Sequence, residues 1–470
     1  MLRRRSRSRR RTAWCLVATL AALATPAPAG DRTVYEPGVD PAIGFNLVSW
    51  WNFGGSGATR WRDAVRNVHA AGFTEVSISP VRYANPSTGV IAASSQRGPE
   101  LSHIAAGIAE AKGLGMTVTV NPFVEMENFA FWRGEYDPTP GSASWDAFWD
   151  GYTAYLGEVA AVAQANGADA MNIGTELKAI TRNSGNNERW GEVIATVDAA
   201  FDGALGYAAN WDNYRHGNLN NAIWSNPAID YVGIDAYFRD TTTAAESDAS
   251  GADPNEAFIA KVEAGWNTRL DDEILPYARS LRGGDGLPVV LTEVGYLPYN
   301  RTTVNPQNES GPLDSDEQVM AFKGLVRALD GRRDELSAIH VWQWGMDGSG
   351  GSKWNVAASP GGDQPNNLPL GEWLSSFVSA PALAGDFNSD GAVDAADYTV
   401  WRDNLGSETA LPGDTTPGSV TAADYDVWRS NFGTSAADQN AANVAAPEPR
   451  AFLTIGLGAV LFSAARGCRA

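Results

Sequence analysis

Cysteine is almost absent from this sequence of 470 residues. Its two cysteines, Cys15 and Cys468, lie in terminal segments that we expect to be removed during export. A mature chain without a thiol has no disulfide, no cysteine nucleophile and no thiolate metal site. Histidine is scarce as well, with four scattered residues, and neither an H-x-x-x-H nor a G-x-S-x-G motif occurs. These absences argue against a zinc protease and a serine hydrolase.

Positive charge is also in short supply. The chain has 35 Lys and Arg against 55 Asp and Glu, for a formal net charge of −20. Such a surface repels phosphate backbones, so nucleic acid is excluded as a partner. The 17 tryptophans and the aromatic content of 10% are typical of a protein that stacks on sugar rings, although part of this set belongs to any core. Neutral polysaccharide, calcium or another protein is the expected partner.

The N-terminus carries an export pattern. An Arg-rich run at 3–11 precedes an apolar stretch at 13–24, and Ala27-Pro28-Ala29 follows. A basic segment, a short apolar segment and a small-x-small site predict a signal peptide over residues 1–29. The alternative is a short retained anchor, but the run is shorter than the roughly 20 residues that span a bilayer.

The C-terminus has a related pattern. Pro447-Glu448-Pro449 precedes an apolar stretch at 451–465 and a basic end at 466–469. This order resembles the bacterial PEP-CTERM sorting signal, and the alternative is a plain C-terminal anchor. The resemblance implies a removable segment over 450–470, preceded by a linker over 434–449. It also implies only transient membrane contact and a secreted or cell-surface protein.

Short apolar runs alternate with longer amphipathic runs between residues 43 and 380. We expect strands at 43–50, 75–80, 116–121, 170–175, 203–209, 231–237, 288–293 and 338–344. Apolar residues at helical spacing predict helices at 59–71, 99–113, 144–167, 188–201, 255–281, 315–329 and 371–379. The remaining crossover, 218–226, is a poor helix of one or two turns.

Eight strands that alternate with helices indicate an α/β fold. We predict a (β/α)8 TIM barrel over residues 30–380, because eight parallel strands are the number that closes such a barrel. The alternative is an open, doubly wound sheet. Against it, no G-x-G-x-x-G turn follows a strand, and the glycines at 348–351 come after the last strand instead.

The composition changes after the barrel. In the segment 385–397, acidic and amide residues recur at the spacing of a 12-residue calcium loop, with Gly391 at the sharp turn. The expected calcium ligands are Asp386, Asn388, Asp390, Asp394 and Asp397, together with the carbonyl of Ala392. Asp397 stands where an EF-hand has Glu.

The segment 397–402 (DYTVWR) is repeated at 424–429 (DYDVWR). Two such loop–helix units resemble a type I dockerin, a small all-α calcium-binding module. The resemblance covers 384–433 and implies a cohesin-type protein partner. The second loop departs from it, because Thr416 and Gly418 replace the ligands of the first.

Two strands of the barrel end in glutamates. Glu176 follows the fourth strand and Glu293 closes the seventh, which places both at the C-terminal mouth. Two carboxyl groups across a mouth suit glycoside hydrolysis, where one protonates the leaving oxygen and the other attacks or stabilises the anomeric carbon. At a separation of about 5–5.5 Å such a pair retains the anomeric configuration. Glu125 and Glu127 follow the third strand and are interpreted as residues of a solvated loop.

Aromatic and amide groups occupy other strand ends. Tyr237 could hydrogen-bond Glu293, while Asp235 is interpreted as structural. Trp342 and Trp344 share a face of the last strand and could form a floor under a sugar ring. We also expect contacts to substrate from Trp50 and Asn121, at the ends of the first and third strands.

Four motifs in order, GTEL at 174–177, YAANWD at 207–212, YVGIDAY at 231–237 and TEVGY at 292–296, resemble glycoside hydrolase family 113. That family implies a clan A (β/α)8 barrel and a retaining endo-β-1,4-mannanase that needs no cofactor for catalysis. Carried over by position, Glu176 is the acid/base and Glu293 the nucleophile. Tyr237 supports Glu293, and Asn210 and Trp211 line the subsites.

Two departures bear on the substrate. Thr175 precedes Glu176 where the clan commonly has Asn. On the third strand, Asn121-Pro122-Phe123 replaces an expected Lys and His pair. β-1,4-Mannan is the first expectation, and another β-linked glucan or xylan is the enzymatic alternative. A barrel kept only as a carbohydrate-binding or surface-scaffold protein is the alternative of another class, and the presence of both glutamates argues against it.

Overall fold

The computed structural model describes residues 32–35, 42–92, 97–239, 256–307, 311–330, 332, 335–346, 354, 384–387, 393–407, 411 and 419–434. The chain divides into two compact units, 1–378 and 379–470, which are treated separately. The predicted signal peptide, the C-terminal sorting segment and the helix at 371–379 lie outside the described residues. In the described part of the chain, no helix has both the length and the apolar character needed to cross a membrane.

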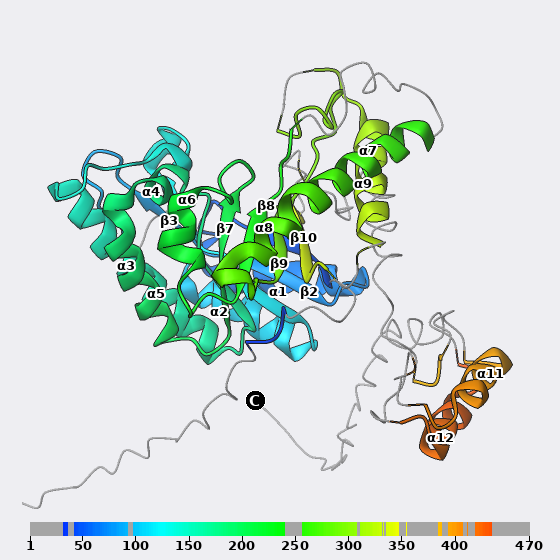
Figure 1. Ribbon diagram of the computed structural model, residues 1–470. Coiled ribbons are helices and arrows are strands. Elements are labelled where there is room, and N and C mark those ends of the chain that lie inside the picture. The colour runs from blue at the N-terminus through cyan, green and yellow to red at the C-terminus, as the bar shows by residue number, and fades with distance from the viewer. Residues whose placement is uncertain are drawn as a thin grey trace, which may run out of the picture. The chain divides into compact units, whose positions relative to one another are not determined.

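The first unit is built on a closed barrel of eight parallel strands (Figure 1). In barrel order the strands are β1 (Ala42–Val48), β2 (Glu75–Ser79), β4 (Thr117–Val120), β6 (Ala170–Thr175), β7 (Ala204–Asn210), β8 (Tyr231–Asp235), β9 (Val289–Val294) and β10 (Ala338–Val341). Strand β10 pairs with β1 and closes the ring. The eight predicted strands and the barrel are therefore confirmed, and the open sheet is excluded.

Two further strands continue the barrel wall. β3 (Val81–Ala84) and β5 (Phe123–Met126) follow β2 and β4 and pair with each other in parallel. A proline, Pro80 or Pro122, lies just before each of them. Proline has no N–H to donate to a ladder, so each long strand is interrupted there. The sequence analysis ended its strands at these prolines and missed the continuation.

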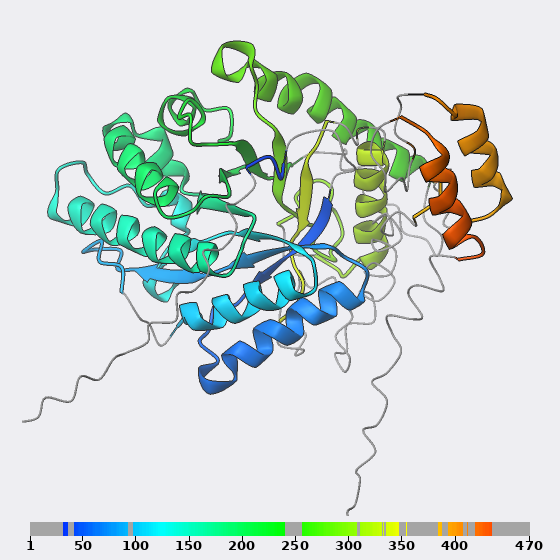
Figure 2. The ribbon, with the colours of Figure 1, turned by 90° about the horizontal axis from the view of Figure 1, so that it is seen from below.

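Helices cover the outside of the barrel (Figures 1 and 2). The longer ones are α1 (Gly57–Ala70), α2 (Leu101–Gly113), α3 (Ala143–Ala165), α5 (Asn187–Asp198), α7 (Glu256–Arg269), α8 (Leu275–Ser280) and α9 (Ser315–Asp330). Shorter pieces are α4 (Lys178–Arg182), α6 (Gly217–Leu219), 3₁₀ turns at 54–56, 127–129, 133–135, 184–186 and 281–284, and π-helical turns at 220–224 and 270–274. The weak crossover predicted at 218–226 is thus α6 with one π turn.

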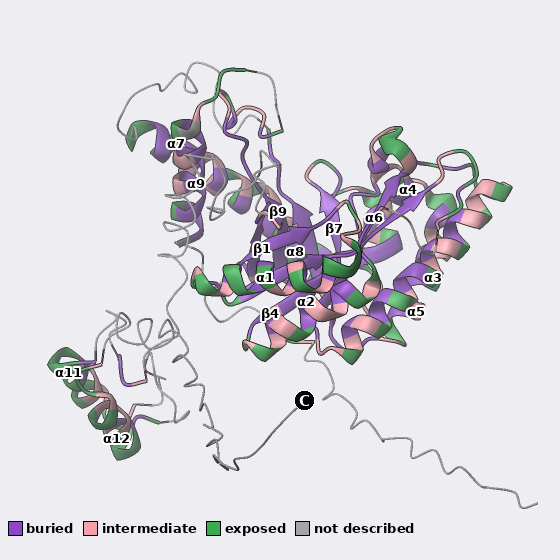
Figure 3. Cartoon of the chain, turned by 180° about the vertical axis from the view of Figure 1, so that it is seen from behind, coloured by how far each residue is buried: buried purple, intermediate pink, exposed green. Residues whose placement is uncertain are grey.

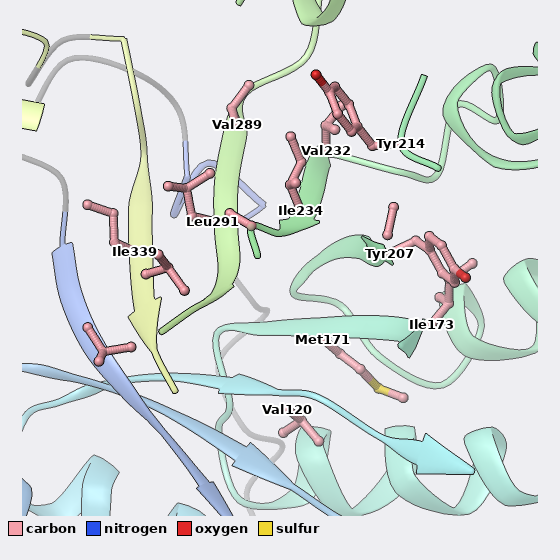
Figure 4. Close-up of a cluster of buried hydrophobic side chains, with 14 of the residues drawn as sticks. Val120, Met171, Ile173, Tyr207, Tyr214, Val232, Ile234, Val289, Leu291 and Ile339 are labelled. Carbon is pink, nitrogen blue, oxygen red and sulfur yellow. The ribbon is translucent and has the colours of Figure 1, made fainter. Parts of the chain in front are cut away.

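The strands are buried on both faces (Figure 3). Apolar side chains of successive strands, among them Val120, Met171, Ile234 and Leu291, pack in one continuous core (Figure 4). Burial on both faces explains why the strands have continuous apolar runs rather than alternating patterns. A rigid, fully packed wall of this kind fixes the strand ends, and therefore the side chains that follow them.

The bottom of the barrel is closed by Tyr35. Its ring is buried and packs against the first residues of β6, β7, β8 and β10, which are Ala170, Ala204, Tyr231 and Ala338. Three of these four are alanines, so the strand ends leave room for a large ring. The sequence analysis gave this tyrosine no role, since a single aromatic residue between the predicted signal peptide and the first strand carries no periodic pattern.

A buried polar cluster surrounds the Tyr35 hydroxyl. The hydroxyl donates to Glu75 Oε1 at 2.6 Å and also contacts the hydroxyl of Thr119. His340 Nε2 lies 2.6 Å from the same Glu75 oxygen. Burial of a carboxylate is costly unless hydrogen bonds compensate for the lost water. Tyr35 therefore satisfies Glu75 as well as filling the barrel bottom.

We predict that Tyr35→Phe lowers the free energy of unfolding by about 2 kcal/mol, because a hydrogen bond to a charged group is lost. Tyr35→Ala should cost more, because it leaves a cavity as well. The matched control is Tyr155→Phe, since the buried Tyr155 hydroxyl has no hydrogen-bond partner among the described residues. Denaturant unfolding of the three variants checks this, and equal losses for the two Phe variants would contradict it.

The second unit contains two helices on the repeated segments, α11 (Ala395–Asn404) and α12 (Ala422–Asn431). Each begins with a capping box, formed by Asp394 with Asp397 and by Thr421 with Asp424. The indole of the tryptophan in each helix donates to the N-cap carbonyl of the other helix at 2.7 Å. The sequence repeat thus produces a structural repeat with reciprocal contacts.

Candidate active site

A cleft with a volume of about 630 Å³ opens at the C-terminal ends of the barrel strands. Its lining includes six of the residues singled out from the sequence: Glu176, Asn210, Trp211, Tyr237, Glu293 and Trp342. They come from the ends of five neighbouring strands, β6 to β10. The closed barrel therefore brings together residues that are up to 166 positions apart in the chain.

Glu176 is held in an unusual backbone conformation at the end of β6. Its φ is +53°, in the left-handed region that non-glycine residues rarely adopt. A register shift between β6 and β7 precedes it, and its N–H donates to Ala208 O at 2.8 Å. Gly174, two residues earlier, has φ +155°, and a Cβ there would lie 2.4 Å from the Tyr152 hydroxyl. The GTE sequence therefore permits a local bend that aims the Glu176 side chain into the cleft.

The Glu176 carboxylate is almost fully buried and has a donor on each oxygen. Asn210 Nδ2 donates to Oε1 at 2.7 Å, and Arg133 Nη2 donates to Oε2 at 2.6 Å. Charge-assisted hydrogen bonds of this kind favour the ionised carboxylate. Glu176 is therefore fixed in orientation by a donor on each carboxylate oxygen.

Arg133 comes from the 3₁₀ turn that follows β5. Besides Glu176 it binds Glu125 through Nη1 and Thr175 O through Nε, and its guanidinium lies 4.6 Å from the centre of the Phe123 ring. Burial by itself lowers the pKa of Arg133, but the carboxylates of Glu125 and Glu176 outweigh it and hold that pKa above its ordinary value. The cation is therefore permanent.

These contacts correct one expectation and add a missed residue. Glu125 is 6% exposed and ion-paired, so it does not belong to a solvated loop. Arg133 was not singled out, because a loop arginine carries no periodic signal. The only hint was its neighbourhood, Phe131-Trp132-Arg133, in which aromatic residues flank a cation near a strand end.

Glu293, on β9, has a contrasting environment. Its Oε2 accepts a hydrogen bond from the Tyr237 hydroxyl at 2.9 Å, while Oε1 has no hydrogen-bond partner among the described residues. Burial, and secondly the charge on Glu176, raise the pKa of Glu293 to about 8, although Arg133 and Tyr237 act in the opposite direction. Burial and the charge of Glu176 thus favour the protonated form of Glu293 in the unliganded protein.

Asp235 lies beside Glu293 in the strand register but beneath the cleft. It is fully buried, and Thr292 Oγ1 donates to its Oδ1 at 2.7 Å. Burial, and then the charges on Glu293 and Glu176, hold the pKa of Asp235 well above its usual range. A buried Asp235 that does not line the cleft agrees with its interpretation as structural.

Asn121 does not contact the cleft, which corrects its assignment to substrate binding. The residue is fully buried, and its Oδ1 accepts from Asn172 Nδ2 at 2.9 Å and from Thr175 Oγ1 at 2.8 Å. Asn121 lies between the end of β4 and Pro122, and its side chain turns into the barrel, where amide and hydroxyl groups need partners. Asn121 and Thr175 thus tie β4 to β6 directly below Glu176.

Two tryptophans also differ from expectation. Trp344 packs edge-on against Phe45 and Phe73 at centroid distances of 5.1 and 6.4 Å, so it belongs to the core rather than to a sugar-binding floor. β10 ends at Val341, so the strict alternation assumed for Trp342 and Trp344 does not hold. Trp50 packs against Phe123 and Trp342 and is not among the residues lining the cleft.

The cleft has aromatic lining that the sequence analysis did not identify. Trp132 and Trp354 line it together with Trp211 and Trp342. The Trp354 ring lies 5.3 Å from that of Tyr237, in an edge-to-face arrangement. Four tryptophans around two carboxyl groups suit a carbohydrate. The apolar faces of sugar rings stack on indoles, while carboxyl groups can hydrogen-bond the sugar hydroxyls and act on the glycosidic bond.

The predicted calcium ligands belong to the second unit. Asn388, Asp390 and Ala392 lie outside the described residues, while Asp386 and Asp397 are both buried and Asp394 caps α11. Within the described ranges, no group of three or more acidic, His or Cys side chains is arranged to hold a metal ion. Buried carboxylate oxygens do fit the donor chemistry that calcium prefers.

Comparisons with known proteins agree with this geometry. The sequence profile of glycoside hydrolase family 113 matches residues 54–351. No protein with a curated description matches the chain. Among solved structures, the chain is similar to a family 113 β-mannanase from Alicyclobacillus acidocaldarius, with 19% identity, a TM-score of 0.55, and coverage of 74% of this chain and 99% of that one.

A second structure, a family 113 β-1,4-mannanase, has 16% identity and a TM-score of 0.56, with coverage of 72% of this chain and 99% of that one. At these identities the two structures show a shared barrel fold. The profile match carries the family assignment, because it spans more than half of the chain and includes Glu176, Glu293 and most of the barrel. The protein therefore belongs to glycoside hydrolase family 113 and is a glycoside hydrolase.

Proposed function

We propose that this glycoside hydrolase cleaves β-1,4-linked mannan with retention of anomeric configuration, with Glu176 as acid/base and Glu293 as nucleophile. The observation that carries the proposal is the pair itself: two buried carboxyl groups face one aromatic cleft at the C-terminal mouth of the barrel. The solved family 113 structures with this fold are named as β-mannanases, which makes mannan the first choice of substrate.

The reaction proceeds in two displacements. In the first, Glu176 protonates the glycosidic oxygen while Glu293 attacks the anomeric carbon, so that the leaving chain departs and a glycosyl ester forms on Glu293. In the second, ionised Glu176 removes a proton from water, and the resulting hydroxyl displaces Glu293. The first displacement leaves Glu176 ionised, as the second requires. The second displacement protonates Glu176 again and frees Glu293, as the first requires.

The first step requires a protonated Glu176 and an ionised Glu293, whereas burial raises the pKa of Glu293 in the unliganded protein. A sugar whose electron-poor anomeric carbon lies beside Glu293 stabilises the Glu293 anion. Substrate binding therefore favours the productive arrangement of charge.

The neighbours of the pair define its geometry. The Tyr237 hydroxyl donates to one Glu293 oxygen, which leaves Oε1 for attack. Asn210 holds Glu176 from the neighbouring strand, at a distance that keeps the carboxyl oriented in either protonation state. Trp211 and Trp342 provide faces on which sugar rings stack at either side of the scissile bond.

A second candidate substrate is another β-linked glucan or xylan. The observation that favours it is the wall formed by β4 and β5, where Asn121 points into the barrel and Phe123 is covered by Arg133. The sugar contacts expected there from a Lys and His pair are absent among these residues. Relative rates on mannan, β-glucan and xylan therefore distinguish the two candidate substrates.

Reducing-sugar release from mannan, β-glucan and xylan tests the proposal. We expect the highest rate on mannan and an initial product of retained configuration by ¹H NMR. Glu293→Ala should lose about 10⁴-fold or more in kcat, because no glycosyl ester can form. Glu176→Ala should lose about 10²–10⁴-fold on mannan. With a dinitrophenyl glycoside it should lose little in the first step, because that leaving group needs no acid.

The matched control is Glu158→Ala, which removes an exposed carboxylate on α3 outside the cleft. It should retain wild-type activity. No activity on the three polymers, inverted product, or activity that survives Glu293→Ala would each refute the proposed mechanism.

Tyr237→Phe removes the only hydrogen bond that the described residues give Glu293. Because that bond favours the ionised form, its loss raises the pKa of Glu293 further above about 8. The acid limb of the pH profile of kcat/KM should move to higher pH by about one unit. An unchanged acid limb would show that Tyr237 does not support the nucleophile.

For the second unit we propose a dockerin-like calcium module that docks onto a cohesin-type protein, on a secreted or cell-surface enzyme. The support is the ligand spacing of the first loop, the burial of Asp386 and Asp397, and the repeated helices α11 and α12. Calcium would be held by the oxygen donors of this loop and takes no part in glycoside cleavage.

Calcium titration of the full-length protein by calorimetry tests the module. We expect Asp386→Ala to weaken binding by about tenfold or more, because a charged ligand is lost. Asp426→Ala is the control, since Asp426 is an exposed residue of α12 paired with Arg429. Equal affinities for the two variants would exclude Asp386 as a ligand.

A further inference from the structure

Arg133 is fixed more firmly than binding to substrate alone would require. Its three nitrogens are each used: Nη1 by Glu125, Nη2 by Glu176 and Nε by the carbonyl of Thr175. The guanidinium plane also rests over the Phe123 ring. A planar fork with all its nitrogens engaged has one orientation, so the position of the cation relative to Glu176 is fixed by the fold.

The charges around this cation have an unusual distribution. Glu176 has two donors, one of them the Arg133 cation, whereas Glu293 has a single neutral donor. The first displacement needs a neutral Glu176 and an anionic Glu293, which these donors do not favour. They suit the glycosyl-enzyme instead, in which an ester neutralises Glu293 and Glu176 acts as base.

We propose that Arg133, held by Glu125, is a positioning residue that keeps Glu176 ionised in the glycosyl-enzyme, so that Glu176 can act as the base of the second displacement. This inference rests on the roles assigned to the two glutamates above. Removal of the proton from Glu176 in the first displacement creates a buried anion, and Arg133 lies where that charge develops. Preorganised charge of this kind costs no rearrangement at the moment of reaction.

Glu125 has a distinct part in this arrangement. A buried arginine paired with one carboxylate alone is neutralised by it, but Arg133 is shared between two carboxylates. Glu125 thus holds the guanidinium on the Glu176 side of the cleft and moderates its effect. The reaction needs this moderation, because a cation committed to Glu176 alone would oppose protonation of Glu176 in the first displacement.

The proposal separates the two chemical steps, so it is tested with a substrate that isolates the second. A 2,4-dinitrophenyl β-mannobioside needs no acid for departure of its leaving group, so hydrolysis of the glycosyl-enzyme limits kcat, while kcat/KM reports the first displacement. For Arg133→Met we expect kcat at pH values on the acid limb to fall about tenfold or more, with kcat/KM at the same pH changed by less than about threefold. A burst of dinitrophenolate equal to the enzyme concentration should precede the slow steady state.

Two further readouts report on Glu176 itself. In Arg133→Met, the acid limb of kcat should move to higher pH by about one unit or more, because the anion has lost its cation. Azide, which attacks the ester without a general base, should restore kcat. If the role of Arg133 were merely structural, the acid limb of kcat would not shift and azide would not restore kcat.

Three other variants define the comparison. Arg133→Lys keeps a point charge without the fork and should give an intermediate loss. Glu125→Gln leaves Arg133 to Glu176 alone and should move the acid limb in the opposite direction, to lower pH. The matched control is Arg189→Met, because Arg189 also stacks on an aromatic ring and pairs with acidic residues, but on the protein surface. It should match the wild type. If Arg133→Met does not fold, as judged by thermal unfolding, the Lys and Gln variants carry the same test.

The inference is overturned if kcat and kcat/KM fall together, if no burst precedes the steady state, or if azide leaves kcat unchanged. Failure of the underlying function gives a different result, because then the wild type would be inactive on mannan or Glu293→Ala would remain active.

Discussion

Two carboxyl groups buried at the mouth of one barrel cannot both be ionised without compensation, and most features of this site follow from that constraint. Burial and the charge of Glu176 raise the pKa of Glu293. Arg133 binds Glu176 and not Glu293, while Tyr237 donates to Glu293. The asymmetry of the donors, rather than the number of charges, differentiates Glu176 from Glu293.

The barrel contributes by making the positions of the two groups independent of their own interactions. The walls of β6 and β9 are packed on both faces and bound to their neighbours along their length. Mutual repulsion of the carboxylates therefore cannot push them apart. Glu176 even remains in a left-handed backbone conformation, which costs of the order of 1–3 kcal/mol and persists because the surrounding strand ends over-determine it.

The elements of the barrel could be predicted from the sequence because a strand buried on both faces has a continuous apolar run. Glutamates at the ends of two such runs could be placed at one mouth from their order alone. The position of a residue along a strand predicts less well whether its side chain points into the cleft or into the interior. Asn121 and Trp344 were expected in the cleft, but a proline after one and the end of β10 before the other turn both side chains into the interior. Tyr35 and Arg133 lie outside any periodic element, and Glu125 lies on β5, a short strand that the sequence analysis did not predict. The roles of all three depend on contacts across the fold.

Arg133 illustrates why loop residues matter so much in this family fold. The rigid strands fix the two carboxyl groups, but neither β4 nor β5 carries a positively charged side chain. A loop residue that stacks on Phe123, Arg133, can supply the charge from the side, and Glu125 on β5 can regulate it. The strands therefore determine where the reaction takes place, while the loop after β5 determines how readily Glu176 gives up its proton and takes one back.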